Sequence, residues 1–270
     1  MSTAEHLTLP TDKILARIED GIGWLTFNQP EKRNAISLGM WQGVTVAAQT
    51  FARDERVRVV VMSGAGGKAF ASGADISEFD KNRSSAEAED EYKRISAGGR
   101  QALMAVDKPL IAMIEGFCIG GGLATALLAD LRIATPDSRF AIPAARLGVA
   151  YAAESLQRLV ALTGPAVAKD IMFTARQLKA DEALAIGLIN RIVPADALQS
   201  EVAALGRTIA GNAPLTIRHA RASIDMLTGD PAARDMARLD AMYRTCFDSA
   251  DYREGRAAFA QKRSPVFTGR

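Results

Sequence analysis

Short apolar runs alternate with glycine-containing loops and helical stretches up to Ile192, and this alternation constrains the fold more than any other feature. The runs VRVVVMSG, KPLIAMIEG and LRIAT each have the length and residue types of a buried strand. Strand–loop–helix units repeated in this way predict an α/β fold with largely parallel pairing. After Ile192 no strand pattern remains. A series of helices is expected there, broken near Gly211–Pro214, Gly229–Pro231 and Ser249–Asp251.

Local signals mark the first elements of the chain. A hairpin is expected in ILARIEDGIGWLTFN, because the Asp20-Gly21 pair favours a tight turn between two β-branched runs. Ser37 is expected to cap a helix that continues to about Arg53. The apolar face of that helix is expected to consist of Met40, Val44, Ala47 and Phe51.

The composition is that of an ordinary globular chain. Of the 270 residues, 48% are hydrophobic and 24% are charged, and the net charge of +2 generates no strong field toward nucleic acid or an anionic membrane. The two cysteines, Cys118 and Cys246, lie far apart, and we expect both to be reduced. The first residues, MSTAEHLTLPTDK, lack the basic start and apolar centre of a signal peptide. These features predict a cytoplasmic protein that binds neither nucleic acid nor membrane.

The balance of strands and helices changes near residue 200. Residues 1–200 are therefore expected to form the α/β core, and residues 201–270 a separate helical region. Within the core, residues 81–100 combine charge, serine and small side chains. This segment is expected to be mobile, with a largely helical conformation as the alternative.

Common catalytic signatures are missing from the sequence. The two histidines, His6 and His219, have neither metal-ligand spacing nor a neighbouring nucleophile, and HExxH, CxxC and GxSxG do not occur. The loop SGAGGKAF contains Gly67-Lys68, but a Walker A loop requires a hydroxyl residue where Ala69 stands. A metal site and a nucleotide-phosphate loop are therefore both disfavoured.

Two loops of small residues remain as candidate sites. AFASGADI follows the strand VRVVVMSG, and GFCIGGG follows the strand PLIAMI and opens a helix. Loops at the carboxyl ends of parallel strands line the ligand crevice of an α/β sheet. Bare backbone N–H groups from both loops could converge as an oxyanion hole, with the helix N-terminus favouring negative charge. Alternatively, the glycines only permit close packing of helix on strand, and the local pattern leaves both interpretations open.

Six motifs carry a family resemblance, and in order they are NQPEKRNAIS, KAFASGADISEF, KPLIAMIEGFCIGGGLATALLADLRIAT, RFAIPAARLGV, ADEALAIGLINRIVP and EGRAAFAQKRSPVFTG. From about Ile14 to Gly269 the chain resembles the crotonase, or enoyl-CoA hydratase/isomerase, superfamily. The resemblance implies a spiral of ββα units and a C-terminal helical region for trimerisation. It further implies a homotrimer or a hexamer built as a dimer of trimers. The substrate implied is an acyl-CoA thioester, in which coenzyme A is part of the substrate and no other cofactor is needed.

The same resemblance implies which residues act. Members stabilise a thioester enolate with two backbone N–H groups, whose matching positions are Ser72 and Gly121, and this favours the oxyanion-hole interpretation. The positions that match contacts to coenzyme A are Lys32, Arg33, Ala35, Ala74, Asp75, Ile76, Phe259 and Lys262. Phe259 and Lys262 match positions that often reach the coenzyme A of a neighbouring subunit. For Lys262 a plain solvated helix end is the alternative, and Asp75 is interpreted as structural rather than catalytic.

The sequence departs from the family pattern at the acid–base positions. Hydratases of the family use two glutamates, whose matching positions here are Ala124 and Ala144. Alanine cannot transfer a proton, so neither the usual hydration nor the common isomerase route is expected to operate unchanged. The loop that follows supplies Tyr151 and Glu154. Some decarboxylase-like members place a tyrosine at the position of Tyr151, which favours a pocket role for it, whereas Glu154 is interpreted as a carboxylate at a helix N-terminus.

Three functional interpretations follow. The first is an acyl-CoA enzyme of the hydratase/isomerase superfamily, a lyase or isomerase, with an oxyanion hole and altered acid–base residues. The second is a decarboxylase or hydrolase that relies on Tyr151. The third is a non-catalytic acyl-CoA binder, which the absence of both carboxylates would permit.

Overall fold

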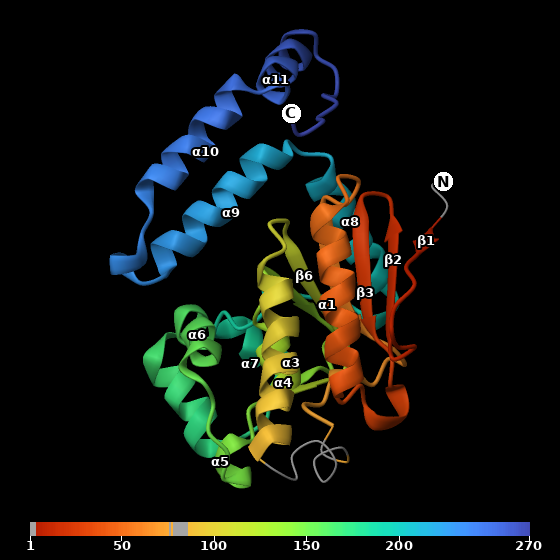
Figure 1. Ribbon diagram of the computed structural model, residues 1–270, viewed down its shortest axis with the longest axis vertical. Coiled ribbons are helices and arrows are strands. Elements are labelled where there is room, and N and C mark those ends of the chain that lie inside the picture. Colours follow the sequence, from red (N-terminus) through yellow and green to blue (C-terminus); the bar gives the residue numbers. More distant parts are fainter. Residues whose placement is uncertain (1–3, 76, 78–85) are drawn as a thin grey trace.

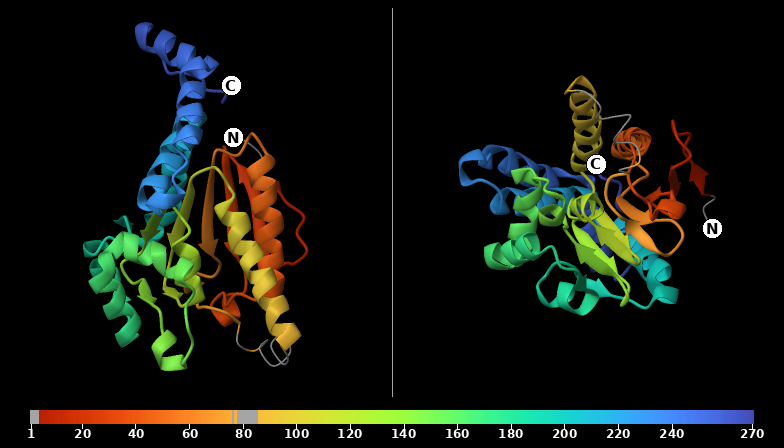
Figure 2. Two further views of the ribbon diagram at one scale, coloured as in Figure 1. Left: turned by 60° about the vertical axis from the view of Figure 1, so that its left-hand side comes forward. Right: turned by 90° about the horizontal axis from the view of Figure 1, so that it is seen from below.

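The computed structural model describes residues 4–75, 77 and 86–270, without the side chains of residues 86, 88, 89 and 154. The described residues form a body with two sheets, from which a helical arm extends (Figure 1, Figure 2). The larger sheet has the order β1-β2-β3-β4-β6-β8-β11, with strands at Glu5–His6, Ile14–Glu19, Ile22–Phe27, Val59–Gly64, Leu110–Ile114, Leu131–Ala134 and Arg191–Ile192. The smaller sheet has the order β10-β9-β7-β5, with strands at Leu178–Lys179, Arg139–Ala141, Phe117–Ile119 and Ala69–Ala71.

The strand pairing confirms the predicted α/β class. In the larger sheet β3, β4, β6, β8 and β11 pair in parallel, whereas β1, β2 and β3 pair antiparallel. Each of β4, β6 and β8 is followed along the chain by a short strand of the second sheet, and then by a helix. Those helices are α3 at Ala86–Met104, α4 at Gly121–Ala126 and α5 at Ala144–Leu147. The repeated unit is the ββα spiral that the resemblance implies.

The local predictions at the start of the chain are confirmed. β2 and β3 pair around Asp20 and Gly21, which adopt φ of 51° and 79°, as the tight hairpin turn requires. Helix α1 spans Leu38–Arg53, and the Ser37 hydroxyl accepts a hydrogen bond from the Met40 N–H at 3.2 Å. The predicted apolar face of α1 is fully buried.

The larger sheet is buried on both faces, which accounts for its nearly continuous apolar strands. On β4, Val60 and Met62 face the main core, which α1 and the second sheet also line. Val59 and Val61 face the other way, against helix α8 at Ala195–Ala210. The sheet is therefore a rigid platform whose loops can be held in fixed positions.

Several elements escaped the sequence analysis. The strands of the second sheet are only two or three residues long, too short to show a period. The helix that GFCIGGG was expected to open extends only from Gly121 to Ala126. Beyond it, the N–H and carboxylate of Asp130 pair with the backbone of Leu110. Also unforeseen were α5 and α7 at Ala180–Ala185, with short 3₁₀ turns at Pro30–Lys32 and Pro231–Ala233. A helix was expected to begin beside Glu154, and α6 at Ala153–Thr174 does so. Of residues 81–100, those from 86 onward belong to α3, and 81–85 lie outside the described residues.

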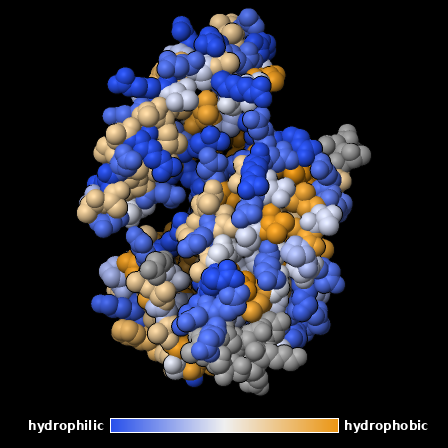
Figure 3. Space-filling model, viewed as in Figure 1, coloured by the Kyte–Doolittle hydropathy of each residue, from blue (hydrophilic) through white to orange (hydrophobic). Residues whose placement is uncertain are grey.

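The last part of the chain is helical, as predicted. Beyond α8, α9 at Pro214–Thr228, α10 at Met236–Asp248 and α11 at Ala250–Ala260 form the arm, and the breaks lie where the sequence places them. The expected boundary at residue 200 falls within α8, whose buried face packs on the larger sheet. Arg221 ties the arm to the body through an ion pair with Asp130 at 3.0 Å. Figure 3 shows the surface hollowed between arm and body.

Candidate functional site

The three glycines of the triplet, Gly120 to Gly122, have different structural roles at the turn that precedes α4. Gly120 has a φ of 56°, in the region that favours glycine, and precedes α4. A methyl group on Gly122 would collide with the Ala71 carbonyl of β5. Gly121 lies between them as the first residue of α4, and no acceptor for its N–H lies within hydrogen-bonding reach in the described part of the chain. Close packing therefore explains Gly122, and an available donor remains at Gly121.

A second loop approaches the triplet at this point. β5 and β7 are parallel neighbours, so the segments that follow them meet at one edge of the smaller sheet. A methyl group built on Gly121 would lie 3.6 Å from the Ala74 nitrogen, and one built on Gly73 would lie 3.8 Å from the Gly121 nitrogen. The backbone N–H groups of Ala74 and Gly121 therefore belong to one small region.

The hydrogen bonds of the second loop single out Ala74 rather than Ser72. The Ser72 N–H, the expected partner of Gly121, donates to the Arg33 carbonyl at 3.1 Å. Among the residues that the structure describes, none accepts a hydrogen bond from the Ala74 N–H. The candidate pair of free donors is thus the N–H groups of Ala74 and Gly121. The donor of this loop lies two residues after Ser72, the predicted position.

The segment 33–36 holds this loop in place. The Ile36 N–H donates to the Gly73 carbonyl at 2.7 Å, and the Asp75 N–H donates to the Ile36 carbonyl at 3.0 Å. The buried Asn34 fixes the segment in turn, since its side chain bonds the Gln29 N–H and the Ala69 carbonyl at 2.9 and 2.7 Å. Sequence reasoning assigned no role to Asn34 or Gln29, and their signal was only a polar stretch after a strand.

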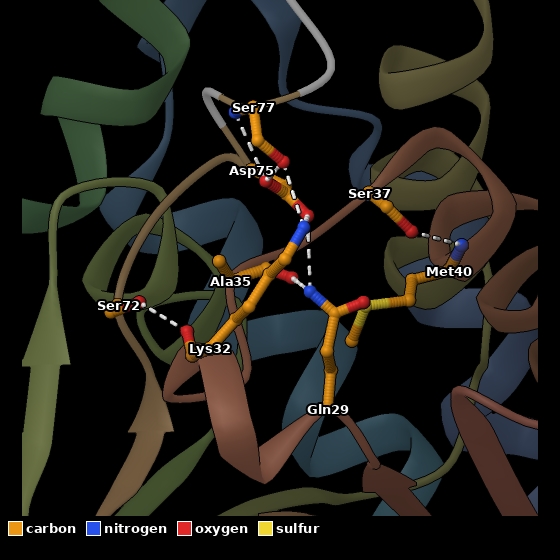
Figure 4. A network of polar contacts seen from close by, with 8 residues as sticks. All are labelled: Gln29, Lys32, Ala35, Ser37, Met40, Ser72, Asp75 and Ser77. Atoms are coloured by element: carbon orange, nitrogen blue, oxygen red, sulfur yellow. Dashed lines mark hydrogen bonds and ion pairs between the residues drawn. The ribbon is translucent and has the colours of Figure 1, made fainter.

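Asp75 is the most heavily bonded carboxylate near the site (Figure 4). Its Oδ2 accepts from Gln29 Nε2 at 3.0 Å and Lys32 Nζ at 2.9 Å, and its Oδ1 accepts from the Ser77 N–H and hydroxyl at 3.1 and 2.6 Å. Burial raises the pKa of Asp75, but the bonds from Ser77, Lys32 and Gln29 outweigh it and lower the pKa to about 2. Asp75 is therefore an ionised structural anchor.

The depressed pKa of Asp75 predicts a pH-dependent contribution to stability. Because the folded-state pKa of about 2 lies below the ordinary value, the stabilisation is complete above about pH 4 and is lost as the pH falls toward 2. Asp75→Asn is expected to lower the free energy of unfolding at pH 7 by about 2 kcal/mol, with the difference vanishing near pH 2. Urea titrations across this range measure it, with the exposed Asp12→Asn as control. Equal stability of native protein and Asp75→Asn at pH 7 would contradict the assignment.

The other expected coenzyme A contacts lie beside the same loop. Lys32 is 43% exposed in its side chain although it pairs with Asp75, and Arg33 is exposed with its guanidinium 4.8 Å from the centre of the Phe117 ring. Ala35 is buried beneath them. Ile76 lies outside the described residues. Two cations thus border the loop from the solvent side.

Tyr151 reaches the glycine triplet from the segment before α6. A methyl group on Gly120 would lie 3.5 Å from the Tyr151 hydroxyl oxygen, and 3.8 Å from Pro143 Cδ. The ring is half-buried and packs against the main core. Burial raises the pKa of Tyr151, so the phenol is neutral at pH 7, and its hydroxyl has no hydrogen-bond partner among the described residues. It is a protic group beside the two free N–H groups.

The two alanines lie close to this turn. Ala124 is half-buried, one helical turn after Gly121 in α4. Ala144 is buried and follows Pro143 at the start of α5. Glu154 lies in the first turn of α6, and its side chain is outside the described part of the structure. No carboxylate is present at either alanine, as the sequence dictates.

Phe259 and Lys262 lie apart from the loops in this chain. Phe259 is 88% exposed on α11, and Lys262 is exposed just beyond the end of that helix. Figure 1 places α11 at the opposite end of the molecule from α5. Within this chain, neither residue therefore lies beside the two loops.

The described residues contain neither a candidate metal site nor a candidate membrane span. Across residues 4–75, 77 and 86–270, no three His, Cys, Asp or Glu side chains cluster as metal ligands would. In that same part of the chain, no helix is both long and apolar enough to cross a bilayer. Cys118 and Cys246 are free thiols, and burial raises the pKa of Cys118.

The fold and the paired loops are those of an α/β protein with two mixed sheets and C-terminal helices, and comparisons with known proteins identify the family. The family model for enoyl-CoA hydratase/isomerase matches residues 17–270. A crotonyl-CoA hydratase of Syntrophomonas wolfei is 32% identical over 256 residues, covering 95% of this chain and 98% of that protein. A short-chain-enoyl-CoA hydratase of Clostridium acetobutylicum is 31% identical over 255 residues, covering 93% and 96%.

A solved structure agrees with these sequence matches. The crystal structure of an enoyl-CoA hydratase/carnithine racemase from Magnetospirillum magneticum superimposes with a TM-score of 0.91 at 40% identity, covering 97% of each chain. The chain belongs to the enoyl-CoA hydratase/isomerase family. Its fold is the crotonase fold, as the sequence motifs imply.

Proposed function

We propose that the protein is an enzyme that converts acyl-CoA thioesters by stabilising a thioester enolate between the N–H groups of Ala74 and Gly121. The observation that carries this proposal is the pair of free donors at the meeting point of two loops. As the thioester becomes an enolate, negative charge develops on its oxygen. Donors already held in place stabilise that charge without reorganising, and each is worth roughly 10²–10³ in rate.

The remaining contacts to coenzyme A follow from family membership. Lys32 and Arg33 are cations beside the loop, and phosphate groups of coenzyme A are suitable partners for them. Ala35, Ala74, Asp75 and Ile76 would lie along the adenine and pantetheine. Phe259 and Lys262 would contact the coenzyme A of a neighbouring subunit in a trimer or a dimer of trimers, with residues 201–270 as the oligomerisation region. The compartment proposed is the cytoplasm.

The acid–base step is where we propose a difference from the named relatives. The relatives described above are called hydratases, but alanines replace both expected carboxylates in this chain. Without a general base, water addition is expected to be about 10²–10⁴-fold slower than in an enzyme that has one. Glu154 is a further acidic residue of this segment, for which a helix-terminal role remains the interpretation.

A second candidate function, decarboxylation, is favoured by the neutral phenol of Tyr151. Loss of CO₂ generates an enolate without any base: the bond between the α-carbon and the carboxylate breaks, and its electron pair becomes the enolate. The α-carbon then takes a proton from the Tyr151 hydroxyl, and water reprotonates the phenolate. Before the bond breaks, the same hydroxyl can donate to the substrate carboxylate.

Tyr151→Phe tests this second function. With a malonyl-type thioester as substrate, the variant is expected to turn over about 10–100-fold more slowly, as for loss of a hydrogen bond to a charged group. Mass spectrometry of the acyl-CoA products measures the change. Tyr243→Phe, on the exposed face of α10, is the matched control and is expected to behave as the native protein. An unchanged rate in Tyr151→Phe would exclude the hydroxyl from the reaction.

A panel of acyl-CoA thioesters separates the remaining possibilities. Turnover of any member supports the enzyme proposal, and the product identifies the reaction. Binding of coenzyme A thioesters without turnover of any of them would instead support the third interpretation, a non-catalytic acyl-CoA binder. Crotonyl-CoA hydration at a normal rate for the family would contradict the importance given to the two alanines.

A further inference from the structure

The peptide that carries the Ala74 N–H is held by bonds on both sides. On one side the Gly73 carbonyl accepts from the Ile36 N–H, and on the other the Asp75 N–H donates to the Ile36 carbonyl. The Gly73 carbonyl and the Ala74 N–H share one peptide plane, so a rotation that redirected the N–H would break the bond from Ile36. The bond of the Asp75 N–H fixes the next peptide, and with it the position of Ala74. The direction of this donor therefore depends on what immobilises Gly73, Asp75 and Ile36.

The side chain of Asp75 supplies much of that immobilisation. It is 4% exposed, and its two oxygens accept four hydrogen bonds, from Gln29, Lys32 and both donors of Ser77. In Figure 4 these side chains converge on the carboxylate from the segments on either side of it. The carboxylate has no freedom to turn unless several of these bonds break together.

Gln29 is the fully buried member of this group. It is 1% exposed and donates to Asp75 Oδ2 at 3.0 Å and, at 3.4 Å, to the Ala35 carbonyl. Its backbone N–H is in turn bonded to the Asn34 side chain. Gln29 thus links the segment 33–36 to the carboxylate of Asp75, the residue that follows the free N–H of Ala74. Gln29 itself does not contact the Ala74 or Gly121 N–H.

We propose that Gln29, acting through Asp75, is a positioning residue that sets the direction of the Ala74 N–H in the oxyanion hole. This inference rests on the proposed function, because it assumes that Ala74 is a donor to the substrate. It assigns Gln29 and the Ser77 hydroxyl a role in polarising the thioester rather than in binding coenzyme A. Lys32 belongs to both sets, since its ammonium group bonds Asp75 from the solvent side.

The direct readout is the infrared band of a bound thioester carbonyl. The probe is hexanoyl-CoA labelled with ¹³C at the thioester carbon, bound to the native protein, to Gln29→Met and to Ser77→Ala. Gln29→Met keeps the length of the side chain and removes its donor. Ser77→Ala alters an exposed position, and therefore provides a second variant that is expected to fold. The control is Thr135→Val, which removes a fully buried hydroxyl bonded to Ser138.

In the native protein the band is expected at lower frequency than in free hexanoyl-CoA, because two donors polarise the carbonyl. In Gln29→Met and Ser77→Ala this frequency shift is expected to shrink, because the thioester carbonyl is no longer aligned with the Ala74 N–H. The Kd of free coenzyme A is expected to stay within about twofold of the native value, because Lys32 and Arg33 remain. With a turned-over substrate, kcat is expected to fall about tenfold or more and KM to stay unchanged.

Two negative results have different meanings. If Gln29→Met and Ser77→Ala retain the full frequency shift of the native protein, as Thr135→Val is expected to do, Gln29 has no positioning role. The assignment of the oxyanion hole would then still stand. A native band at the frequency of the free thioester would overturn the Ala74 and Gly121 assignment itself, and the inference about Gln29 with it.

Discussion

Replacing both Ala124 and Ala144 with glutamate is expected to raise the rate of crotonyl-CoA hydration by about 10²–10⁴-fold, the usual contribution of general acid–base catalysis. In the proposed function, the free N–H groups of Ala74 and Gly121 polarise the thioester. The side chains at positions 124 and 144 are alanines, which can neither activate water nor return its proton. If the two alanines account for that deficit, restoring the carboxylates restores the missing step.

The surroundings of the two positions favour functional carboxyl groups. Ala124 is half-buried, and it lies on the same side of α4 as Gly121, one turn later. Ala144 is 3% exposed, so burial would raise the pKa of a glutamate there and make it a proton donor near neutral pH. Pro143, its neighbour, already lies near the triplet turn.

The matched control is the double variant with glutamine at both positions, which has the same shape and cannot transfer a proton. Hydration is measured by the loss of absorbance of the enoyl thioester. Because a buried carboxyl is costly, circular dichroism must show that each variant folds, and the single variant Ala124→Glu serves if the double variant does not. Equal hydration rates in the glutamate and glutamine variants would show that carboxyl groups at positions 124 and 144 do not act as the acid and base of the reaction.

Elements with local signals could be predicted from the sequence. Ser37 caps α1 and Asp20-Gly21 turns the first hairpin, and both signals depend on residues within a few positions of one another. The strands of the second sheet could not be predicted in this way. Their two or three residues are strands only because partners far along the chain lie beside them.

The same distinction applies to the candidate site. The two loops follow from the order of strands and glycines, and Gly121 was assigned through the family resemblance. Which N–H of the other loop is free depends on pairing with the segment 33–36, where the Arg33 carbonyl takes the Ser72 N–H. No local pattern in the sequence specifies that register, so the structure was needed to move the candidate donor to Ala74. Asn34 and Gln29 were missed for the same reason, since their partners lie more than thirty positions away or in the backbone.

Gly121→Pro is expected to reduce turnover by about 10²–10³-fold while leaving the fold intact. Proline has no N–H and is well tolerated at the first position of a helix, which is where Gly121 lies. Since no acceptor in the described part of the chain uses the Gly121 N–H, its removal breaks no hydrogen bond there. The loss would therefore fall on the substrate, which needs that donor as charge develops on the thioester oxygen.

Gly121→Ala is the matched control for this experiment. It keeps the N–H, and its methyl group would meet Ala74 and Gly73 at 3.6–3.7 Å, which is ordinary contact. Both variants are compared by thermal unfolding, by the Kd of free coenzyme A, and by turnover of the best substrate in the acyl-CoA panel. The oxyanion assignment requires that Gly121→Pro lose far more activity than Gly121→Ala at equal stability and equal affinity for coenzyme A. If the proline variant folds and turns over substrate at the rate of the alanine variant, the Gly121 N–H does not stabilise the transition state.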